Sequence, residues 1–517
     1  MITEKRSTKE TEIIQSVNPK TQQKCLETFF VTTEEELHSV VEKADQAWKT
    51  YKNTSGKQKA TFLRTIANEI EALGEALVKC AMAESGLPEG RIVGERGRTC
   101  NQLRLFADLV EEGSWVEATV DEALPDRKPM PRVDIRKMLV ALGPVAVFTA
   151  SNFPLAFSTA GGDTASALAA GCPVIVKSHP SHLGTNALVA KAIDNAIKVC
   201  GLPEGVFSTI NGGIKTGLSL VKRQLIQAVS FTGSYQGGKA LFDVANKRKQ
   251  PIPVYAEMGS NNPVFILEEK LNSEYESLAR TIADSVNLGA GQFCTNPGIL
   301  VLQKGQCVAV FLEALTEAFK TLQQQTMLNQ NVFEGYEKSR AACLETSGVK
   351  KQFESENFGN EWLGRPAYAT VSGKDFLKNE LLQEEIFGPF TLIVICDDDS
   401  EFKVVANSFQ GQLTTTIMAT EKELSEASNL LEILSQKSGR VIFNGVPTGV
   451  EVCHAMHHGG PFPSTLNALY TSVGTDAIKR FARPVVYQNM PNNMLPDALK
   501  QKNPLDIWRT VNGEKVK

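Results

Sequence analysis

The sequence lacks the features that mark membrane and secreted proteins. Its best apolar candidate, residues 138–150, is interrupted by Gly143 and Pro144 and stays below the roughly 18 residues of a membrane-spanning helix. Residues 1–10 are polar and charged, without the apolar core of a secretory signal. We therefore predict a cytoplasmic protein with no membrane partner.

An excess of charge of one sign is also missing. Lys and Arg total 54 against 58 Asp and Glu, a formal charge of -4, which argues against nucleic acid as a partner. The ten cysteines include no Cys-x-x-Cys pair, so we predict a reducing compartment and no structural zinc. The chain has no internal repeat and no low-complexity segment. Its 517 residues exceed one ordinary core and suggest about three units at roughly 150 residues each.

The pattern of apolar, polar and proline residues changes several times along the chain. Residues 33–113 carry apolar positions at three- and four-residue steps, as in Leu37, Val40, Val41 and Ala44, which predicts helices. Residues 115–142 alternate and contain several prolines, which favours an arm or edge hairpin suited to subunit contact. The tail from residue 483 is similarly rich in residues that favour extended chain, and we expect it to pair with this arm.

From residue 143 onward, short apolar runs alternate with helical stretches. This alternation predicts an α/β fold with parallel strands, and ligands then belong at the carboxyl ends of those strands. The first set of predicted strands is 145–149, 173–176, 206–210, 228–232 and 253–257. A second set is 263–267, 299–302, 389–395 and 441–444, which indicates a second α/β domain.

Polar residues follow the strands of the first set at the points where a ligand is expected. Asn152 follows the first strand and either donates its amide to a developing oxyanion or caps the next helix. Lys177 ends the second strand and either holds a ribose or phosphate or is an ordinary solvated lysine. Each residue alone is weak evidence, and their shared position is the stronger signal.

The fourth and fifth strands of the first set end in the same manner. Gly233 and Ser234 follow the fourth strand and Gly238 lies in the next helix, a glycine turn at a helix N-terminus that suits a phosphate, although it is not a G-x-G-x-x-G motif. Glu257 ends the fifth strand at the junction of the two α/β sets. It is either an exposed turn acid or a base that faces a cleft.

Cys294 is the candidate nucleophile. Gly289 and Gly291 precede it and Gly298 follows it, so its backbone is able to approach a ligand closely. The alternative is a small buried hydrophobic residue, the commonest fate of a free cysteine. No histidine has a recognisable sequence pairing with Cys294, which argues against a cysteine hydrolase.

Two further groups of residues each have two interpretations. Glu385 and Phe387 precede a strand of the second set and form either a cofactor clamp or an ordinary loop. His454, His457 and His458 are clustered, but no acidic or thiol residue has metal-ligand spacing with them. We predict a substrate-loop role for this segment and no metal.

Taken in order, these motifs resemble the aldehyde dehydrogenase superfamily over nearly the whole chain. The motifs that carry the resemblance are Asn152-Phe153-Pro154-Leu155, Lys177, Phe231-Thr232-Gly233-Ser234, Glu257-Met258-Gly259, Gly291-Gln292-Phe293-Cys294 and Glu385-Ile386-Phe387-Gly388-Pro389. The segments 179–182 and 458–463 resemble the branch that contains α-ketoglutaric semialdehyde (2,5-dioxopentanoate) dehydrogenases and NADP-linked aldehyde dehydrogenases.

The resemblance implies a chemical role for each motif. It implies that Cys294 attacks the aldehyde, that Asn152 and the Cys294 N–H stabilise the oxyanion, and that Glu257 activates water to hydrolyse the thioester. It also implies a cofactor site for NADP or NAD: Lys177 at the adenosine ribose, Gly233, Ser234 and Gly238 at the pyrophosphate, and Glu385 with Phe387 at the nicotinamide.

One departure from the family pattern bears on the cofactor. Members that prefer NAD commonly have a glutamate three residues after the position of Lys177, where this chain has Pro180. Loss of that carboxylate removes a like-charge penalty against a 2′-phosphate, so we expect NADP to be accepted, with Lys215 as a nearby cation. The resemblance favours 2,5-dioxopentanoate, oxidised to 2-oxoglutarate, as the aldehyde substrate. We expect contacts from Phe153 and Thr295, with Arg104 as the cation for the substrate carboxylate.

The predicted fold is therefore α/β, with a Rossmann-like cofactor domain, a second α/β catalytic domain and a small β oligomerisation arm. We place the cofactor domain at residues 1–118 and 141–258, the catalytic domain at 259–465, and the arm and tail at 119–140 and 466–517. The arm predicts a homodimer or homotetramer. A CoA-acylating aldehyde dehydrogenase, a dehydrogenase of other aliphatic aldehydes or semialdehydes, and a catalytically silent binding protein on the same fold stay open as alternatives.

Overall fold

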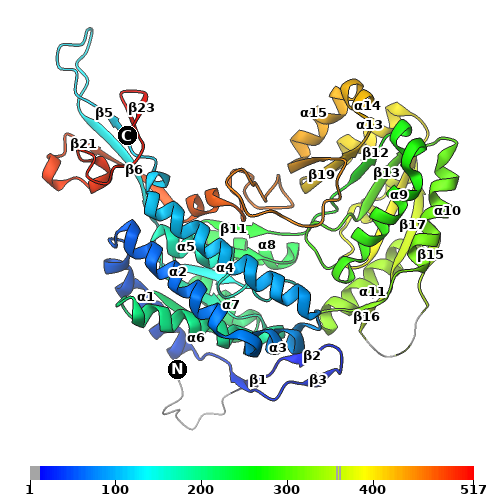
Figure 1. The fold of residues 1–517 in the computed structure, drawn as a ribbon, viewed down its shortest axis with the longest axis horizontal. Helices are drawn as coiled ribbons and strands as arrows, with labels where there is room; N and C mark the ends of the chain where they lie inside the picture. The colour runs from blue at the N-terminus through cyan, green and yellow to red at the C-terminus, as the bar shows by residue number, and fades with distance from the viewer. Residues whose placement is uncertain (1–11, 357–358, 360–361) are drawn as a thin grey trace.

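The computed structural model describes residues 12–356, 359 and 362–517, and residues 1–11, for which we expected no secretory signal, lie outside this part of the chain. Figure 1 shows two α/β lobes side by side and a β arm that projects from the first lobe. The described residues contain no helix that is long and apolar enough to cross a membrane.

The first lobe is built on a five-stranded parallel sheet in the order β11-β10-β7-β8-β9. Its strands are β7 (Val145–Phe148), β8 (Val174–Lys177), β9 (Phe207–Ile210), β10 (Ala228–Thr232) and β11 (Val254–Glu257). All five agree with the strands expected from the sequence to within one residue at either end. Short runs of buried β-branched residues between helical stretches were sufficient to locate them.

Helices cover both faces of this sheet. They are α1 (Glu34–Tyr51), α2 (Gly56–Ala72), α3 (Gly74–Ser85), α4 (Glu89–Glu112), α5 (Gly162–Ala170), α6 (Leu183–Val199), α7 (Ile214–Lys222) and α8 (Tyr235–Asn246). Alternate strand residues face opposite cores: Val145 and Val147 join one apolar cluster, Ala146 and Phe148 the other. The sheet is thus buried on both sides, which leaves only its ends open to a ligand.

The strand order determines where a ligand can enter at the end of the sheet. The chain runs from β7 through β8 to β9 on one side, then returns to build β10 and β11 on the other side of β7. At such a reversal the loops after the two central strands diverge and leave a crevice. Asn152 follows β7 and Ser234 caps α8 after β10, so both lie at this crevice.

The second lobe contains a seven-stranded sheet in the order β15-β17-β18-β13-β12-β19-β20, in which only β15 runs antiparallel. Its strands are β12 (Val264–Ile266), β13 (Ile299–Gln303), β15 (Lys350–Glu354), β17 (Ala367–Ser372), β18 (Phe390–Cys396), β19 (Gln412–Met418) and β20 (Ser438–Phe443). Its helices are α9 (Glu268–Asn287), α10 (Cys307–Lys320), α11 (Gln330–Glu345), α12 (Gly373–Lys378), α13 (Asp399–Ser408), α14 (Glu421–Glu426) and α15 (Ser428–Lys437).

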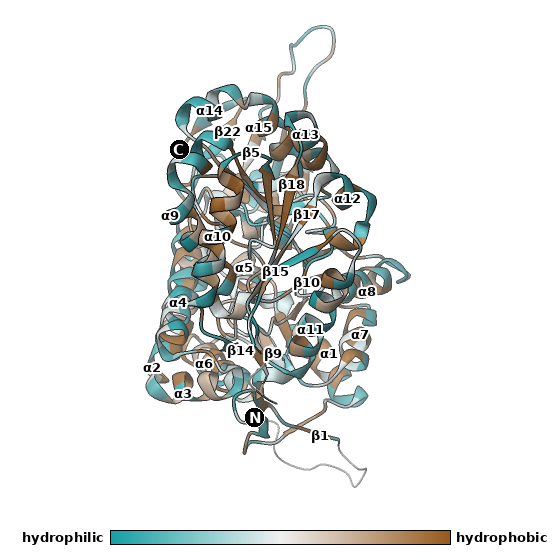
Figure 2. Cartoon of the chain, turned by 90° about the vertical axis from the view of Figure 1, so that its right-hand side faces the viewer, coloured by the Kyte–Doolittle hydropathy of each residue, from teal (hydrophilic) through white to brown (hydrophobic). Residues whose placement is uncertain are grey.

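Three strands of this lobe, β15, β17 and β19, are absent from the sequence prediction. Thr414, Thr415 and Thr416 make β19 look polar, yet all three side chains are buried, and Thr414 and Thr415 hydrogen-bond to Asn262 and Ser438. Figure 2 shows the apolar strands β17 and β18 enclosed by helices whose outer faces are hydrophilic.

The arm is a five-stranded sheet in the order β21-β6-β5-β22-β23. Its strands are β5 (Thr119–Asp121), β6 (Ile135–Ala141), β21 (Ala482–Gln488), β22 (Arg509–Val511) and β23 (Glu514–Val516), so the tail does pair with the segment after α4. The remaining short strands are β1 (Ile13–Ile14) with β4 (Phe29–Phe30), β2 (Val17–Asn18) with β3 (Gln23–Lys24), and β14 (Gln325–Thr326) with β16 (Leu363–Gly364).

The start of the tail differs from our expectation. We placed residues 466–481 with the arm, but Ala477, Ile478 and Phe481 are buried in the core of the first lobe. Arg480 forms a buried ion pair with Asp163 of α5 at 2.8 Å. A buried ion pair and three apolar anchors fix this segment to the first lobe, so the C-terminal part of the arm begins at β21.

The loop that carries Cys294 follows a short 3-10 turn, Leu288–Gly291, after α9. Gly291 has φ +66, and a Cβ built on it would lie 2.2 Å from the backbone carbon of Gly388. Both the backbone conformation and the contact exclude a side chain here. Asn262 holds the other side of the loop, because its amide donates to the carbonyl oxygens of Cys294 and Asn296 at 2.9 Å each.

We expect Gly291→Ala to displace this loop. The left-handed backbone costs alanine about 1–2 kcal/mol and the contact with Gly388 adds strain, so the apparent Tm and the activity both fall. The matched control is Gly335→Ala in α11, where φ is not left-handed and a Cβ meets nothing within 4 Å; this change raises Tm slightly or leaves it unchanged. Equal melting of the two variants contradicts this view of the loop.

Candidate active site

Three segments far apart in the sequence bring Glu257, Cys294 and His458 together. Glu257 ends β11, Cys294 lies in the loop after α9, and His458 belongs to the segment between β20 and the 3-10 turn at residues 475–481. His458 Nε2 lies 2.8 Å from Glu257 Oε1 and 3.5 Å from Cys294 Sγ. The second carboxylate oxygen of Glu257 accepts a 2.6 Å hydrogen bond from Ser472.

This contact corrects one sequence inference. We found no histidine that pairs with Cys294, but His458 does, and its signal was invisible because 164 residues separate the two. The structure also fixes the histidine from its backbone, since its N–H donates to the hydroxyl of Thr471 at 2.8 Å. Ser472 and Thr471 are further contributors that the sequence did not reveal.

The pKa values of the acid and the thiol diverge. Burial is the largest influence on the thiol, and the charge of Glu257 adds to it, so the pKa of Cys294 lies well above its usual value. Burial also raises the pKa of Glu257, but the charge and hydrogen bond of His458 and the hydrogen bond of Ser472 outweigh it, and the net shift is downward. The site therefore holds a protonated thiol beside an ionised carboxylate.

Asn152 lies beside the same loop. Its Nδ2 donates to the carbonyl of Gln292 at 3.0 Å, two residues before Cys294. The next residue, Phe153, packs edge-on against Phe293, with ring centroids 5.5 Å apart. The expected oxyanion donor and the nucleophile are thus held together by a hydrogen bond and an aromatic pair.

Lys177 lies at the carboxyl edge of the first sheet. Its half-buried ammonium has no hydrogen bond or ion pair to any residue that the structure describes, and burial lowers its pKa to about 8. A partly desolvated cation of this kind fits a ligand with hydroxyl or phosphate oxygens.

In the glycine turn after β10, two of the three expected residues are exposed at the turn and the third is not. Gly233 and Ser234 are exposed at the start of α8, where Ser234 accepts from the N–H of Gly237 as the helix cap. Gly238 instead is buried, and a Cβ there would lie 2.7 Å from the sulfur of Met258. Gly238 therefore lets α8 pack closely on the sheet, and does not itself face the turn.

Glu385 and Phe387 approach the site from the second lobe. The carboxylate of Glu385 lies against Gly259, where an added Cβ would clash with it, and burial raises its pKa to about 7. Phe387 is half-buried and precedes Gly388, whose carbonyl accepts from Asn296 of the Cys294 loop at 3.2 Å. This loop and the Cys294 loop are thereby tied together.

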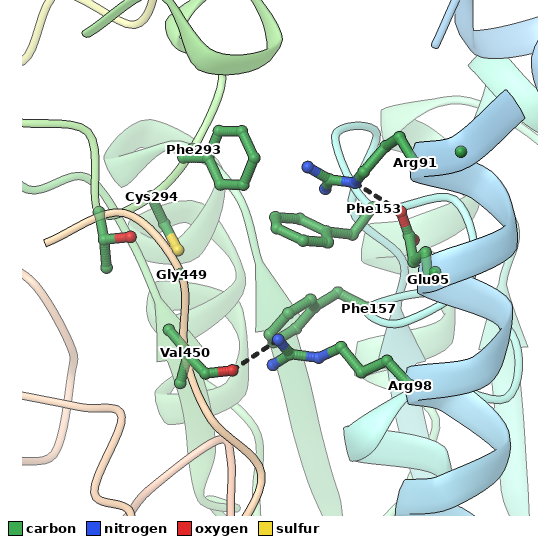
Figure 3. Close-up of a pocket in the computed structure, with 12 residues that line it drawn as sticks. Arg91, Glu95, Arg98, Phe153, Phe157, Phe293, Cys294, Gly449 and Val450 are labelled. Atoms are coloured by element: carbon green, nitrogen blue, oxygen red, sulfur yellow. Dashed lines mark hydrogen bonds and ion pairs between the residues drawn. The ribbon is translucent and has the colours of Figure 1, made fainter. Parts of the chain in front are cut away.

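A cavity of about 250 Å³ opens on Cys294 from the side of α4. Its walls include the rings of Phe153, Phe157 and Phe293 and the side chain of Thr295. Figure 3 shows Arg91 and Arg98 extending from α4 toward this space. The cavity is near the lower limit of about 300 Å³ for small-ligand pockets, which suits a short substrate.

Arg104, which the sequence suggests as the substrate cation, lies outside this cavity. Its guanidinium forms hydrogen bonds to Glu71 at 2.6 and 2.8 Å and to Asn68 at 3.0 Å. The reason is helical geometry: Arg91 and Arg98 are seven residues apart and share one face of α4, whereas Arg104 is six residues beyond Arg98 and projects from another face. The sequence identified the helix but not the face.

The atoms of Glu257, Cys294 and His458 that could bind a metal lie within 4.8 Å of one another. A metal bound there would occupy the thiol, the carboxylate and the imidazole together. The absence of a resident metal stays a prediction.

The comparisons with known proteins agree with this geometry. A model of the aldehyde dehydrogenase family matches residues 5–484. The chain belongs to the aldehyde dehydrogenase family. It is an NAD(P)-dependent enzyme that oxidises an aldehyde, with the fold expected from the sequence.

Relatives and solved structures extend this result. The chain is 46% identical over 501 residues, 97% of its length and 95% of the relative's, to alpha-ketoglutaric semialdehyde dehydrogenase of Acinetobacter baylyi. It is 47% identical to alpha-ketoglutaric semialdehyde dehydrogenase 2 of Azospirillum brasilense, covering 94% of this chain and 93% of the relative. The glyceraldehyde-3-phosphate dehydrogenase GapN of Methanocaldococcus jannaschii, complexed with NADP, shares the fold at 21% identity, with a TM-score of 0.77 and coverage of 92% of this chain and 98% of that one.

We expect His458→Gln to shift the pH dependence of this aldehyde dehydrogenase. The histidine lowers the pKa of Glu257, so without it the pKa rises, and the acid is protonated at a higher pH. The acidic limb of the kcat profile then moves upward by about one pH unit. His457→Gln, the adjacent change outside the Glu257 contact, serves as the control. An acidic limb that does not move in His458→Gln contradicts this role.

Proposed function

We propose that the enzyme oxidises 2,5-dioxopentanoate to 2-oxoglutarate through a thioester on Cys294. The observation that carries the reaction is the contact of Cys294 with His458 beside an ionised, buried Glu257. The substrate is supported by the names of the two relatives that are 46% and 47% identical over nearly the whole chain. A short cavity with two arginines on one wall is consistent with a small anionic aldehyde.

The first step is attack of the Cys294 sulfur on the aldehyde carbon. Because the pKa of the thiol is raised, its proton must leave as the carbon–sulfur bond forms. His458 Nε2, the atom near Sγ, is the same nitrogen that donates to the carboxylate of Glu257, so it does not take up this proton. The proton passes to solvent through the open cavity that Cys294 lines. Asn152 and the backbone N–H of Cys294 donate to the carbonyl oxygen as it becomes negative.

When bound, the oxidised nicotinamide supplies the acceptor for the hydride that leaves the adduct on Cys294. The adduct becomes a thioester, and Glu257 then removes a proton from the water that attacks the thioester carbonyl. The carbon–sulfur bond breaks, the carboxylate leaves, and the sulfur recovers a proton. One aldehyde and one water thus give a carboxylate, with two protons released in all.

The cofactor residues follow from their positions around the crevice. Lys177 would hold the adenosine ribose, Gly233 and Ser234 the pyrophosphate at the start of α8, and Glu385 with Phe387 the nicotinamide end. Pro180, in place of a family glutamate, leaves no carboxylate at this point to repel a 2′-phosphate, so we propose that NADP is accepted as well as NAD.

We also propose a homodimer or homotetramer built through the arm, and a cytoplasmic location. The arm exposes apolar side chains such as Met130 and Val486, at 68% and 55% exposure, which a partner subunit would cover. All ten cysteines are free, which suits a reducing compartment.

Initial rates on matched aldehydes test the substrate. We expect kcat/KM for 2,5-dioxopentanoate to exceed that for the neutral pentanal by at least about tenfold, because a charge interaction adds 1.4 kcal/mol or more. Each substrate is assayed with NAD and NADP, with and without CoA. A preference for pentanal contradicts the proposed substrate, and a requirement for CoA favours the acylating alternative.

A further inference from the structure

Helix α4 forms one wall of the cavity with a single face. Arg91, Glu95 and Arg98 recur at steps of four and three residues, so their side chains project in one direction toward Cys294 (Figure 3). Gly94 lies on the same wall, and a Cβ there would meet nothing within 4 Å. A glycine inside a helix costs about 1 kcal/mol relative to alanine, yet here it keeps the space in front of the arginines open.

The first arginine is already neutralised. Arg91 Nε lies 3.4 Å from the carboxylate of Glu95, whose side chain is buried. The guanidinium of Arg91 lies over the rings of Phe153 and Phe293, at 4.4 and 4.6 Å from their centroids. Its charge is balanced and its position is fixed by two aromatic rings, so Arg91 acts as part of the wall.

Arg98 is different, because it has no carboxylate partner among the residues that the structure describes. Nη1 donates to the carbonyl of Val450 at 2.6 Å, and the guanidinium lies 5.7 Å from the ring of Phe157. Its Nε is buried with no hydrogen-bond acceptor in the described chain. Burial lowers its pKa, while the charge of Glu95 acts in the opposite sense.

An unpaired guanidinium in an aromatic cavity is a receptor for a carboxylate. The planar fork offers parallel N–H groups that match two carboxylate oxygens, and the apolar surroundings strengthen the charge-assisted hydrogen bonds. Arg98 and Cys294 line the same cavity. A short aldehyde with a carboxylate at its far end would span from the thiol to the guanidinium, with its methylene groups against the phenylalanine rings.

We propose that Arg98 is the specificity-determining residue that binds the remote carboxylate of the semialdehyde substrate. Arg91 holds the aromatic wall in place. Because Glu95 already balances its charge, Arg91 does not bind the substrate carboxylate. This inference rests on the proposed function, since it names the group that recognises the anionic end of that substrate. It also replaces Arg104 as the cation for this purpose.

The test compares Arg98→Gln and Arg98→Lys with the matched control Arg104→Gln, which makes the same change on another face of the same helix. The measured quantity is the ratio of kcat/KM for 2,5-dioxopentanoate to kcat/KM for pentanal. We expect this ratio to fall about 100-fold in Arg98→Gln, mainly through KM, and about tenfold in Arg98→Lys, which keeps the charge but loses the fork. Arg104→Gln keeps the wild-type ratio.

Inhibition by a substrate analogue provides a second test of the role of Arg98. Glutarate, a stable dicarboxylate of similar length, is expected to inhibit the wild type and Arg104→Gln competitively and to inhibit Arg98→Gln at least tenfold more weakly. If Arg98→Gln does not fold, as judged by its melting, Arg98→Lys alone decides by the same ratio.

The outcomes separate the two proposals. A wild-type enzyme that prefers pentanal contradicts the proposed function. A wild-type preference for the semialdehyde that persists in both Arg98 variants, with unchanged glutarate inhibition, overturns the role of Arg98 and leaves the proposed function intact. A fall in the ratio in Arg104→Gln as large as in Arg98→Gln also overturns it.

Discussion

A buried hydrogen bond between His458 and Glu257 is the contact on which the site depends. It joins the end of the first sheet to a segment that returns after the second lobe, and it places a hydrogen-bond donor beside a buried carboxylate. An isolated buried carboxylate would take up a proton, and a protonated acid is a poor base. Glu257 therefore stays ionised beside Cys294 only when the folded chain brings His458 to it.

This requirement explains why so many of the supports are non-local. Asn262 holds the Cys294 loop from the start of β12, Gly388 packs on Gly291, and Ser472 completes the partners of Glu257. Each contact is modest alone, but together they hold the thiol and the acid within one small volume. Such supporting contacts keep reacting groups in position without further reorganisation during the reaction.

The sequence predicted the parts of the structure that depend on local pattern. Alternating apolar runs placed the strands of the first sheet, and the polar residues at their ends, Asn152 and Glu257, lie at the site. The pairing of His458 with Cys294 had no local signal, because the residues meet only after folding. Arg104 was wrong for a related reason: a helix with several arginines does not reveal which face it buries until its neighbours are in place. Buried threonines hid β19, since hydrogen bonds inside the sheet satisfy groups that look solvent-facing in sequence.

The most direct test of the account is whether Cys294 carries the acyl group while Glu257 releases it. Glu257→Gln, mixed rapidly with 2,5-dioxopentanoate and NADP, is followed for reduced cofactor and then quenched in acid for peptide mass mapping of all ten cysteines. We predict a burst of about one reduced cofactor per site without turnover, and an acyl adduct on Cys294 alone. Undiminished turnover in this variant, or an adduct on another cysteine, would contradict the assignment.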